Sequence, residues 1–97
     1  MGHQEIKIPP QNIEAEKSVL GSMLIDDEAI GLAIEILDEG WFYEDAHRKI
    51  YRAILELYNH HKNVDLITVS DLLKSRGLLE TIGGVTYLSE IIDFVPS

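Results

Sequence analysis

The sequence predicts an all-α domain of about five helices joined by short loops. Apolar residues recur at helical spacing in successive segments, and residues that start or stop helices bound these segments, such as Asn12 before the first and Gly77 after the fourth. The one run that could form a strand, residues 64–69, has no second strand to pair with. No repeat or low-complexity tract divides the 97 residues, so one small domain is expected.

The segments 11–24 and 26–40 are expected to contain the first two helices, and Gly40 follows the end of the second. Asn12 is placed to cap the first helix, whose acidic first turn suits a helix N-terminus. Gly21 inside it costs about 1 kcal/mol relative to alanine. This cost indicates either that another helix comes close there or that the position is a tolerated weak point. The apolar stripe of the second helix comprises Ile30, Ala33, Ile34 and Leu37.

A short aromatic connection, Trp41-Phe42-Tyr43, leads into the longest periodic segment of the chain. This segment predicts a third helix from about Glu44 to about His60, which should be central in the fold. We expect the three aromatic rings to fill the core between helices. The alternative is an exposed aromatic patch for a partner.

The fourth and fifth helices are predicted after residues that form turns. "NVDLITVSDLLKSRG" indicates a turn and then a helix, with Thr68 as its N-cap, Asp71 as the capping-box partner and Gly77 as its stop. A Gly-Gly turn then starts the fifth helix, which should end before Pro96. Its apolar stripe comprises Val85, Leu88, Ile91 and Ile92.

Three of the four histidines lie in or beside the predicted third helix. His47 and His61 fall on its buried stripe but are separated by ~21 Å at 1.5 Å per residue, so they cannot share a metal ion. His60 and His61 are adjacent and point ~100° apart, unlike the i, i+4 pair of a helical zinc site. We therefore expect His47 to make hydrogen bonds between helices, and the other two to mark a fraying helix end. The alternative for His47 is a ligand or base completed by distant residues.

Composition and charge exclude several classes of protein. Seventeen acidic residues against eight basic ones give a formal net charge of −9, and such a surface repels the phosphates of nucleic acid. A protein partner is therefore expected. The absence of cysteine excludes a disulfide framework, a zinc ribbon and a thiol nucleophile, and fits a cytoplasmic protein.

The N-terminal end predicts neither a membrane anchor nor a secretion signal. No apolar run approaches the ~18 residues that cross a bilayer, so a soluble protein without membrane contact is expected. Residues 1–8 are interpreted as a flexible leader, partly derived from an expression tag, which removes His3 from consideration. Pro9-Pro10 closes this leader.

No catalytic, cofactor-binding or metal-binding residue is predicted in the chain. No lysine follows a glycine, as a phosphate-binding loop requires. Paired acids such as Asp26-Asp27 and Glu44-Asp45 open helices, where dipole and capping effects explain them. The serines are scattered and none lies in a G-x-S-x-G turn. A small metal-dependent enzyme therefore remains only a distant alternative.

The segment "DLITVSDLLKSRGLL" could also be part of a helix-turn-helix element that reads DNA. Lys74 and Arg76 are the only cations on its helix, and Asp65, Asp71 and Glu80 flank them. Few cations among acids would anchor phosphate poorly. An acidic helix-turn-helix DNA-binding regulator is thus the alternative function, not the preferred one.

Several segments together resemble the N-terminal domain of bacterial replicative DNA helicases, the DnaB family. They are "PPQNIEAEKSVLGSML", "WFYEDAHRKIYRAILELY", "VDLITVSDLLKSRGLLE", "IGGVTYLSEI" and "VPS", in this order from Pro9 to Ser97. The resemblance implies a compact orthogonal bundle of about five to six helices over residues 9–97. Trp41 is a departure, because the family more often has an acidic residue before Phe-Tyr.

The resemblance also implies a role. The family's parent protein is a hexameric ring that uses ATP and Mg to move along one DNA strand at the replication fork, in the bacterial cytoplasm at the nucleoid. Its N-terminal heads form a collar and help to dock primase, and a helicase loader is a further possible partner. The helical hairpin and the RecA-like ATPase domain of the family are absent from these residues, so this piece would be the collar and not the motor.

Two residues are candidates for partner contact. Glu14 lies on the polar side of the first helix, and Tyr87 lies early in the fifth helix with a hydroxyl suited to an interface. Favourable placement in the helix dipole is the other reading of Glu14. Partial burial in the domain is the other reading of Tyr87.

Overall fold

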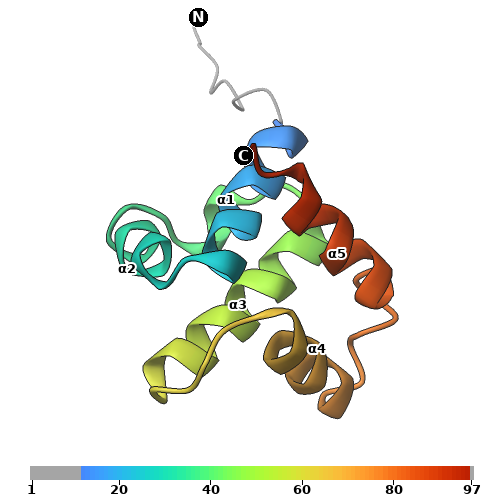
Figure 1. The fold of residues 1–97 in the computed structure, drawn as a ribbon. Coiled ribbons are helices and arrows are strands. Elements are labelled where there is room, and N and C mark those ends of the chain that lie inside the picture. The colour runs from blue at the N-terminus through green and yellow to red at the C-terminus, as the bar shows by residue number, and fades with distance from the viewer. Residues whose placement is uncertain (1–11, 97) are drawn as a thin grey trace, which may run out of the picture.

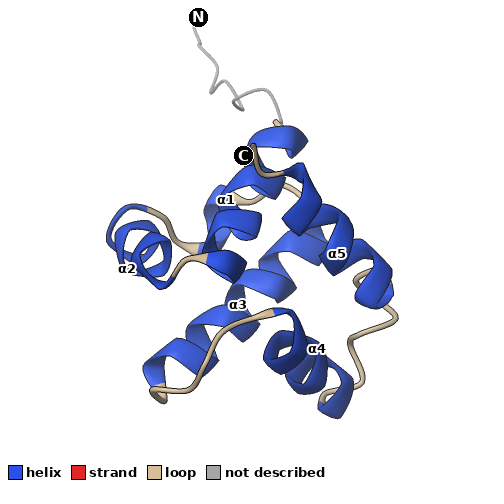
Figure 2. Cartoon of the chain, viewed as in Figure 1, coloured by secondary structure: helices blue, strands red, loops and turns tan. Residues whose placement is uncertain are grey.

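The computed structural model describes residues 12–96, which fold into five α-helices and one short 3₁₀ helix (Figure 1). The predicted leader, Pro9-Pro10, His3 and Ser97 lie outside the described residues. Within residues 12–96 there is no strand, which confirms the all-α prediction (Figure 2). The elements are α1 (Ile13–Ile25), α2 (Asp27–Ile36), η1 (Glu39–Trp41), α3 (Asp45–Asn59), α4 (Leu66–Ser75) and α5 (Gly84–Phe94).

Helix α3 supplies the largest share of the core, as its length and periodicity predict. Its apolar stripe is buried, and Tyr51 donates a hydrogen bond of 2.8 Å to the carbonyl of Leu37 just after α2. Helix α1 packs against α2, α3 and α5, while α4 contacts α3 and α5 (Figure 1). The buried residues of α3 are His47, Ile50, Tyr51, Ala53, Ile54 and Leu57.

The close approach predicted at Gly21 is present. A Cβ at this position would lie 2.6 Å from the carbonyl oxygen of Ile91 and would also meet the side chain of Val95. Real Cβ atoms do not come this close to a backbone oxygen. Glycine is therefore required where α1 crosses α5, and the reading of Gly21 as a tolerated weak position is wrong.

Helix α4 begins earlier than predicted. Asp65, not Thr68, is its N-cap: the Asp65 carboxylate accepts from the backbone N–H of Thr68 at 2.8 Å, and the Thr68 hydroxyl accepts from the N–H of Asp65 at 2.9 Å. Asp65 and Thr68 therefore form the capping box, which the sequence predicts one turn later between Thr68 and Asp71. Gly77, with φ of +72°, follows the helix end as predicted.

The aromatic connection fills the core with only one of its three rings. Phe42 is completely buried, but Trp41 is 44% and Tyr43 is 55% exposed. Consecutive residues leaving a 3₁₀ turn cannot all point the same way, so the prediction was wrong for the two flanking rings. Val85 is also exposed, because it lies in the first turn of α5 at the edge of the fold.

Candidate functional site

The most unusual group in the interior is a chain of three polar side chains from three helices. Glu16 of α1 is 3% exposed and His47 of α3 is 0% exposed, whereas Tyr87 of α5 is half-buried. Buried ionisable groups are costly unless they are paired and hydrogen-bonded. This Glu16–His47–Tyr87 network is therefore the first candidate for a functional site.

Short hydrogen bonds join the three side chains. His47 Nδ1 lies 2.7 Å from Glu16 Oε1, and His47 Nε2 lies 2.6 Å from the Tyr87 hydroxyl. Because a carboxylate only accepts, Nδ1 donates to Glu16, and Nε2 of a neutral ring then accepts from the phenol. The imidazole and phenol rings are stacked, with centroids 5.8 Å apart. Burial raises the pKa of Tyr87, and the negative charges of Glu90, Glu44 and Glu16 raise it further.

Glu16 also holds the backbone that precedes α3. Its carboxylate accepts from the N–H of Tyr43 at 2.8 Å and from the N–H of Glu44 at 3.3 Å. Glu44 makes no side-chain cap for α3, so Glu16 supplies from α1 an acceptor near the start of that helix. One carboxylate of α1 thereby holds both the backbone that precedes α3 and the His47 ring within α3.

An acid, an imidazole and a hydroxyl in a row also occur in catalytic triads, but this network is built for structure. Catalysis requires the hydroxyl to meet a substrate and the imidazole to exchange its proton with it. Here both ring nitrogens are occupied within the core and the ring is inaccessible. The prediction that His47 makes hydrogen bonds between helices is confirmed.

The other two histidines of the predicted helix do not join this network. The His60 ring donates from Nδ1 to the carbonyl of Glu56 at 2.8 Å, which satisfies an acceptor at the C-terminal end of α3. His61 lies beyond the helix with φ of 58° and is exposed, so its expected place on the buried stripe was wrong. Within residues 12–96, no group of three or more histidine, aspartate or glutamate side chains is arranged to hold a metal ion.

The two predicted contact residues lie in different surroundings. Glu14 is exposed in the first turn of α1, while the Tyr87 hydroxyl is occupied by His47. No hydrogen bond joins the two among those of the described residues. Sequence reasoning missed Glu16, although one signal was present: it lies four residues before Leu20, on the apolar stripe of α1.

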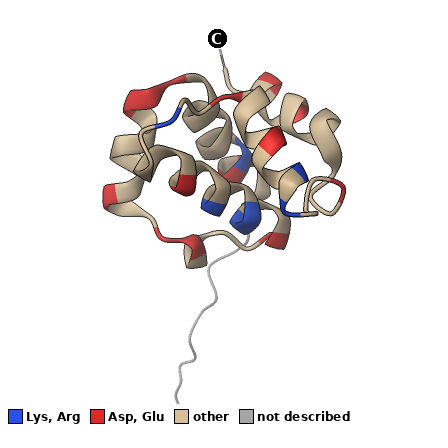
Figure 3. Ribbon diagram, turned by 90° about the horizontal axis from the view of Figure 1, so that it is seen from below, with Lys and Arg blue, Asp and Glu red and all other residues tan. Residues whose placement is uncertain are grey.

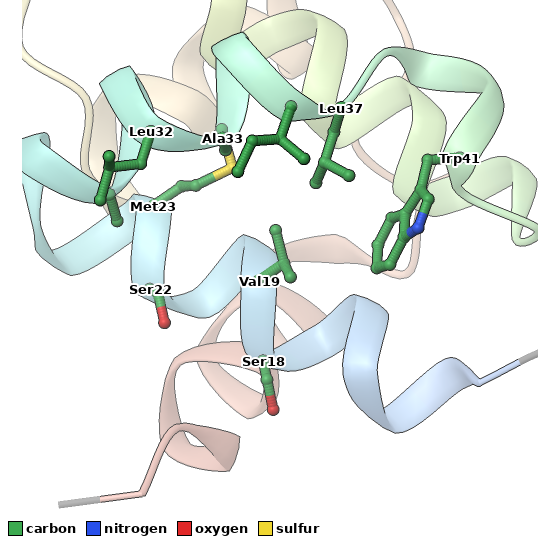
Figure 4. Close-up of a pocket in the computed structure, with 10 residues that line it drawn as sticks. Ser18, Val19, Ser22, Met23, Leu32, Ala33, Leu37 and Trp41 are labelled. Atoms are coloured by element: carbon green, nitrogen blue, oxygen red, sulfur yellow. The ribbon is translucent and has the colours of Figure 1, made fainter.

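The surface offers a second candidate, a hollow of about 400 Å³ between α1, α2 and the Trp41 ring (Figure 4). Val19, Leu37 and Trp41 point toward this space (Figure 4), and the lining also includes Leu32 and Ile36, which are 63% and 77% exposed. Such apolar exposure at one place indicates a contact surface. The hollow has no charged lining residue.

Charge is distributed unevenly around the domain. Figure 3 shows basic residues confined to a few segments and acidic residues spread more widely. On α3, Arg52 donates hydrogen bonds to the Glu39 carboxylate and thereby lowers the pKa of Glu39. Lys49 donates to the Asp45 carboxylate and lowers the pKa of Asp45. Arg76 of the α4 end is paired with Glu56. Arg52, Lys49 and Arg76 are thus each engaged with a neighbouring acid.

The fold and the interior together define an all-helical scaffold, in which the buried Glu16–His47–Tyr87 network joins three helices. Residues 8–97 match the family model described as the DnaB-like helicase N terminal domain. The chain therefore belongs to this family. The assignment does not favour the alternative of a helix-turn-helix regulator.

Relatives of the chain are much longer proteins. It is 46% identical over 96 residues to the replicative DNA helicase DnaB of Rhodothermus marinus, covering 98% of this chain and 10% of that protein. It is 48% identical over 91 residues to the DnaB of Geobacillus stearothermophilus, covering 94% of this chain and 20% of that protein. The chain thus spans a tenth to a fifth of the length of these relatives.

A solved structure shares the fold. The N-terminal domain of DnaB helicase from Mycobacterium tuberculosis superimposes with a TM-score of 0.90 at 47% identity, covering 93% of this chain and 65% of that one. The predicted bundle of five to six helices is confirmed by this match and by the described elements.

None of the helices in residues 12–96 has the length and hydropathy needed to cross a membrane.

Proposed function

We propose that this domain is the collar of a hexameric replicative DNA helicase, where it serves ring assembly and primase docking. The observation that carries the proposal is the match of residues 8–97 to the helicase N-terminal family. The architecture supports it, because an interior tied by the Glu16–His47–Tyr87 network makes a rigid block on which partners can assemble. Rigid scaffolds position contact residues better than mobile loops do.

The parent protein would unwind duplex DNA with ATP and Mg bound in its motor domain, and would meet DNA through the ring. This domain would contribute no catalytic residue, and its acidic surface would keep it away from the DNA backbone. A helicase loader is a further partner. The place of action would be the bacterial cytoplasm, at the nucleoid.

Contact with primase would involve Glu14 and Tyr87. Glu14 projects into solvent at the start of α1 and can pair with a basic group of a partner. Tyr87 presents part of its ring at the surface while its hydroxyl is held by His47, so its orientation is fixed before a partner arrives.

Sedimentation velocity and a binding titration with the C-terminal domain of primase test this function. We expect concentration-dependent self-association of the domain, or saturable binding of the primase domain, or both. Glu14→Gln should weaken primase binding about two- to fivefold through loss of one exposed ion pair. Glu80→Gln, at an exposed turn, is the matched control. A strictly monomeric domain that does not bind primase, or one that binds duplex DNA instead, would refute the proposal.

A further inference from the structure

The hollow between α1 and α2 carries features that the collar role does not explain. Two large aliphatic side chains, Leu32 and Ile36, are four residues apart on α2 and stand exposed beside it. Trp41 closes the same hollow at its far end (Figure 4). This surface, the α1–α2 groove, is lined by neither Glu14 nor Tyr87. Binding at the α1–α2 groove would therefore not require a contact at Glu14 or Tyr87.

The shape of the groove suits an apolar stripe rather than a small molecule. Small-molecule sites combine an apolar lining with a few polar groups that fix the ligand. In this groove the hydroxyls of Ser18 and Ser22 point away from Leu37 and Trp41 (Figure 4). Little remains to orient a polar ligand. An amphipathic helix, in contrast, inserts apolar residues at i, i+3 or i+4 and i+7 into such a groove.

Acidic residues on the wall that α2 contributes to the groove decide which helix fits: Glu28 and Glu35 lie four residues before and three residues after Leu32, so they neighbour it on the helix surface. Residues 26–42, which form α2 and η1 with their caps, contain six acidic residues and no basic one: Asp26, Asp27, Glu28, Glu35, Asp38 and Glu39. Among the ion pairs of the described residues only Glu39 is neutralised, by Arg52. A second copy of the chain would bring an identical acidic face against this one, and like charges oppose such a contact.

From these observations we propose that the α1–α2 groove binds a basic amphipathic helix of another protein. Its apolar stripe would cover Leu32, Ile36 and Trp41, and its lysine and arginine residues would face the carboxylates of α2. Apolar contact would supply affinity, and charge would select the partner.

The chain contains a built-in reporter for this binding, because Trp41 is its only tryptophan and lies in the groove. The probe is a synthetic helical peptide of about 15 residues, roughly four turns, with leucine on one face and lysine elsewhere. We expect a saturable blue shift of Trp41 fluorescence as the peptide covers the ring. Raising the salt from about 0.1 M to about 1 M, which shortens the Debye length from ~10 to ~3 Å, should weaken binding several-fold.

Two variants of equal charge separate groove binding from general attraction. Ile36→Glu removes the most exposed apolar contact of the groove, whereas Ile67→Glu changes an equally bare isoleucine on α4, 69% exposed and outside it. Each adds one negative charge. We expect Ile36→Glu to weaken the lysine peptide roughly ten- to hundredfold, against the direction of its charge, and Ile67→Glu to leave binding unchanged.

Several results would overturn the proposal. They are equal losses in both glutamate variants, equally tight binding of a peptide with glutamate in place of lysine, and no saturable shift at all. A dimer that Ile36→Glu dissociates would instead assign the groove to a second copy. A red shift of Trp41 on deletion of residues 1–11 would assign it to the chain's own N-terminal segment. None of these outcomes depends on primase binding.

Discussion

Replacing Glu16 by alanine should destabilise the domain far more than its place in a helical first turn suggests. The Glu16 carboxylate is 3% exposed and accepts three hydrogen bonds, from the His47 ring and from the backbone N–H groups of Tyr43 and Glu44. Alanine removes every acceptor. It leaves a buried ring N–H and the two backbone donors without this partner, in a space that alanine does not fill.

The cost follows from the geometry. Three donors lose their acceptor, and each buried donor left unsatisfied costs about 1–3 kcal/mol, so the total loss should be at least about 3 kcal/mol. A domain of this size is stable by only about 5–15 kcal/mol. At roughly 4–8 °C per kcal/mol, the melting temperature of Glu16→Ala should fall by at least about 12 °C.

The assay is urea and thermal unfolding followed by circular dichroism, with Glu14→Ala as the matched control. Both glutamates lie in the acidic first turn of α1 and share its helix dipole, but Glu14 is exposed. The control should therefore lose no more than about 1 kcal/mol. Equal losses in the two variants would refute the assignment of Glu16 to a buried network and leave only a dipole effect.

Three further results are expected. Gly21→Ala should lose about 1–3 kcal/mol of stability in urea unfolding, because its Cβ meets the α5 backbone. Gly31→Ala, whose Cβ meets only a phenol oxygen at 3.5 Å, should gain up to about 1 kcal/mol. Equal effects of the two variants would contradict a close crossing of α1 and α5 at Gly21. The pKa of Tyr87 is raised on folding, so the contribution of Tyr87 to stability is complete below about pH 10 and is lost as pH rises through the folded value. Tyrosinate absorbance should show one late titration in the wild type that is missing in Tyr87→Phe. A late titration that persists in the variant would contradict the assignment to Tyr87. The pKa of Glu39 is lowered mainly by its hydrogen bond to Arg52, so the small contribution of Glu39 to stability is present above the ordinary glutamate pKa and is lost as pH falls through the lower folded value. In Arg52→Gln, the Glu39 pKa followed by NMR should return toward its ordinary value.

The helices could be predicted from sequence because their signals are local. The apolar stripe of α3 and the stop at Gly77 depend on residues within one or two turns, and both were found in place. The start of α4 shows the limit of such reasoning. Asp65 and Thr68 can each begin a capping box, and only the backbone angles of the preceding turn decide between them.

The candidate site could be predicted only in part because its contacts are distant in the chain. His47 was expected to join helices, but its partners lie 31 and 40 residues away, on α1 and α5. Glu16 was overlooked because a first-turn acid already has a local explanation. The exposure of Trp41 depends on how η1 turns the chain, which no spacing of apolar residues specifies.

The crossing of α1 and α5 has a consequence for how the chain acquires its structure. The ion pair of Lys17 with Glu90 at this crossing spans 73 residues, so α1 leaves the ribosome well before α5, and the surface of α1 that faces α5 stays uncovered in the interval. Contacts of such long range slow folding, because a large loop must close before they form. A nascent chain that stalls before α5 emerges would leave the apolar surface of α1 that faces α5 accessible to chaperones.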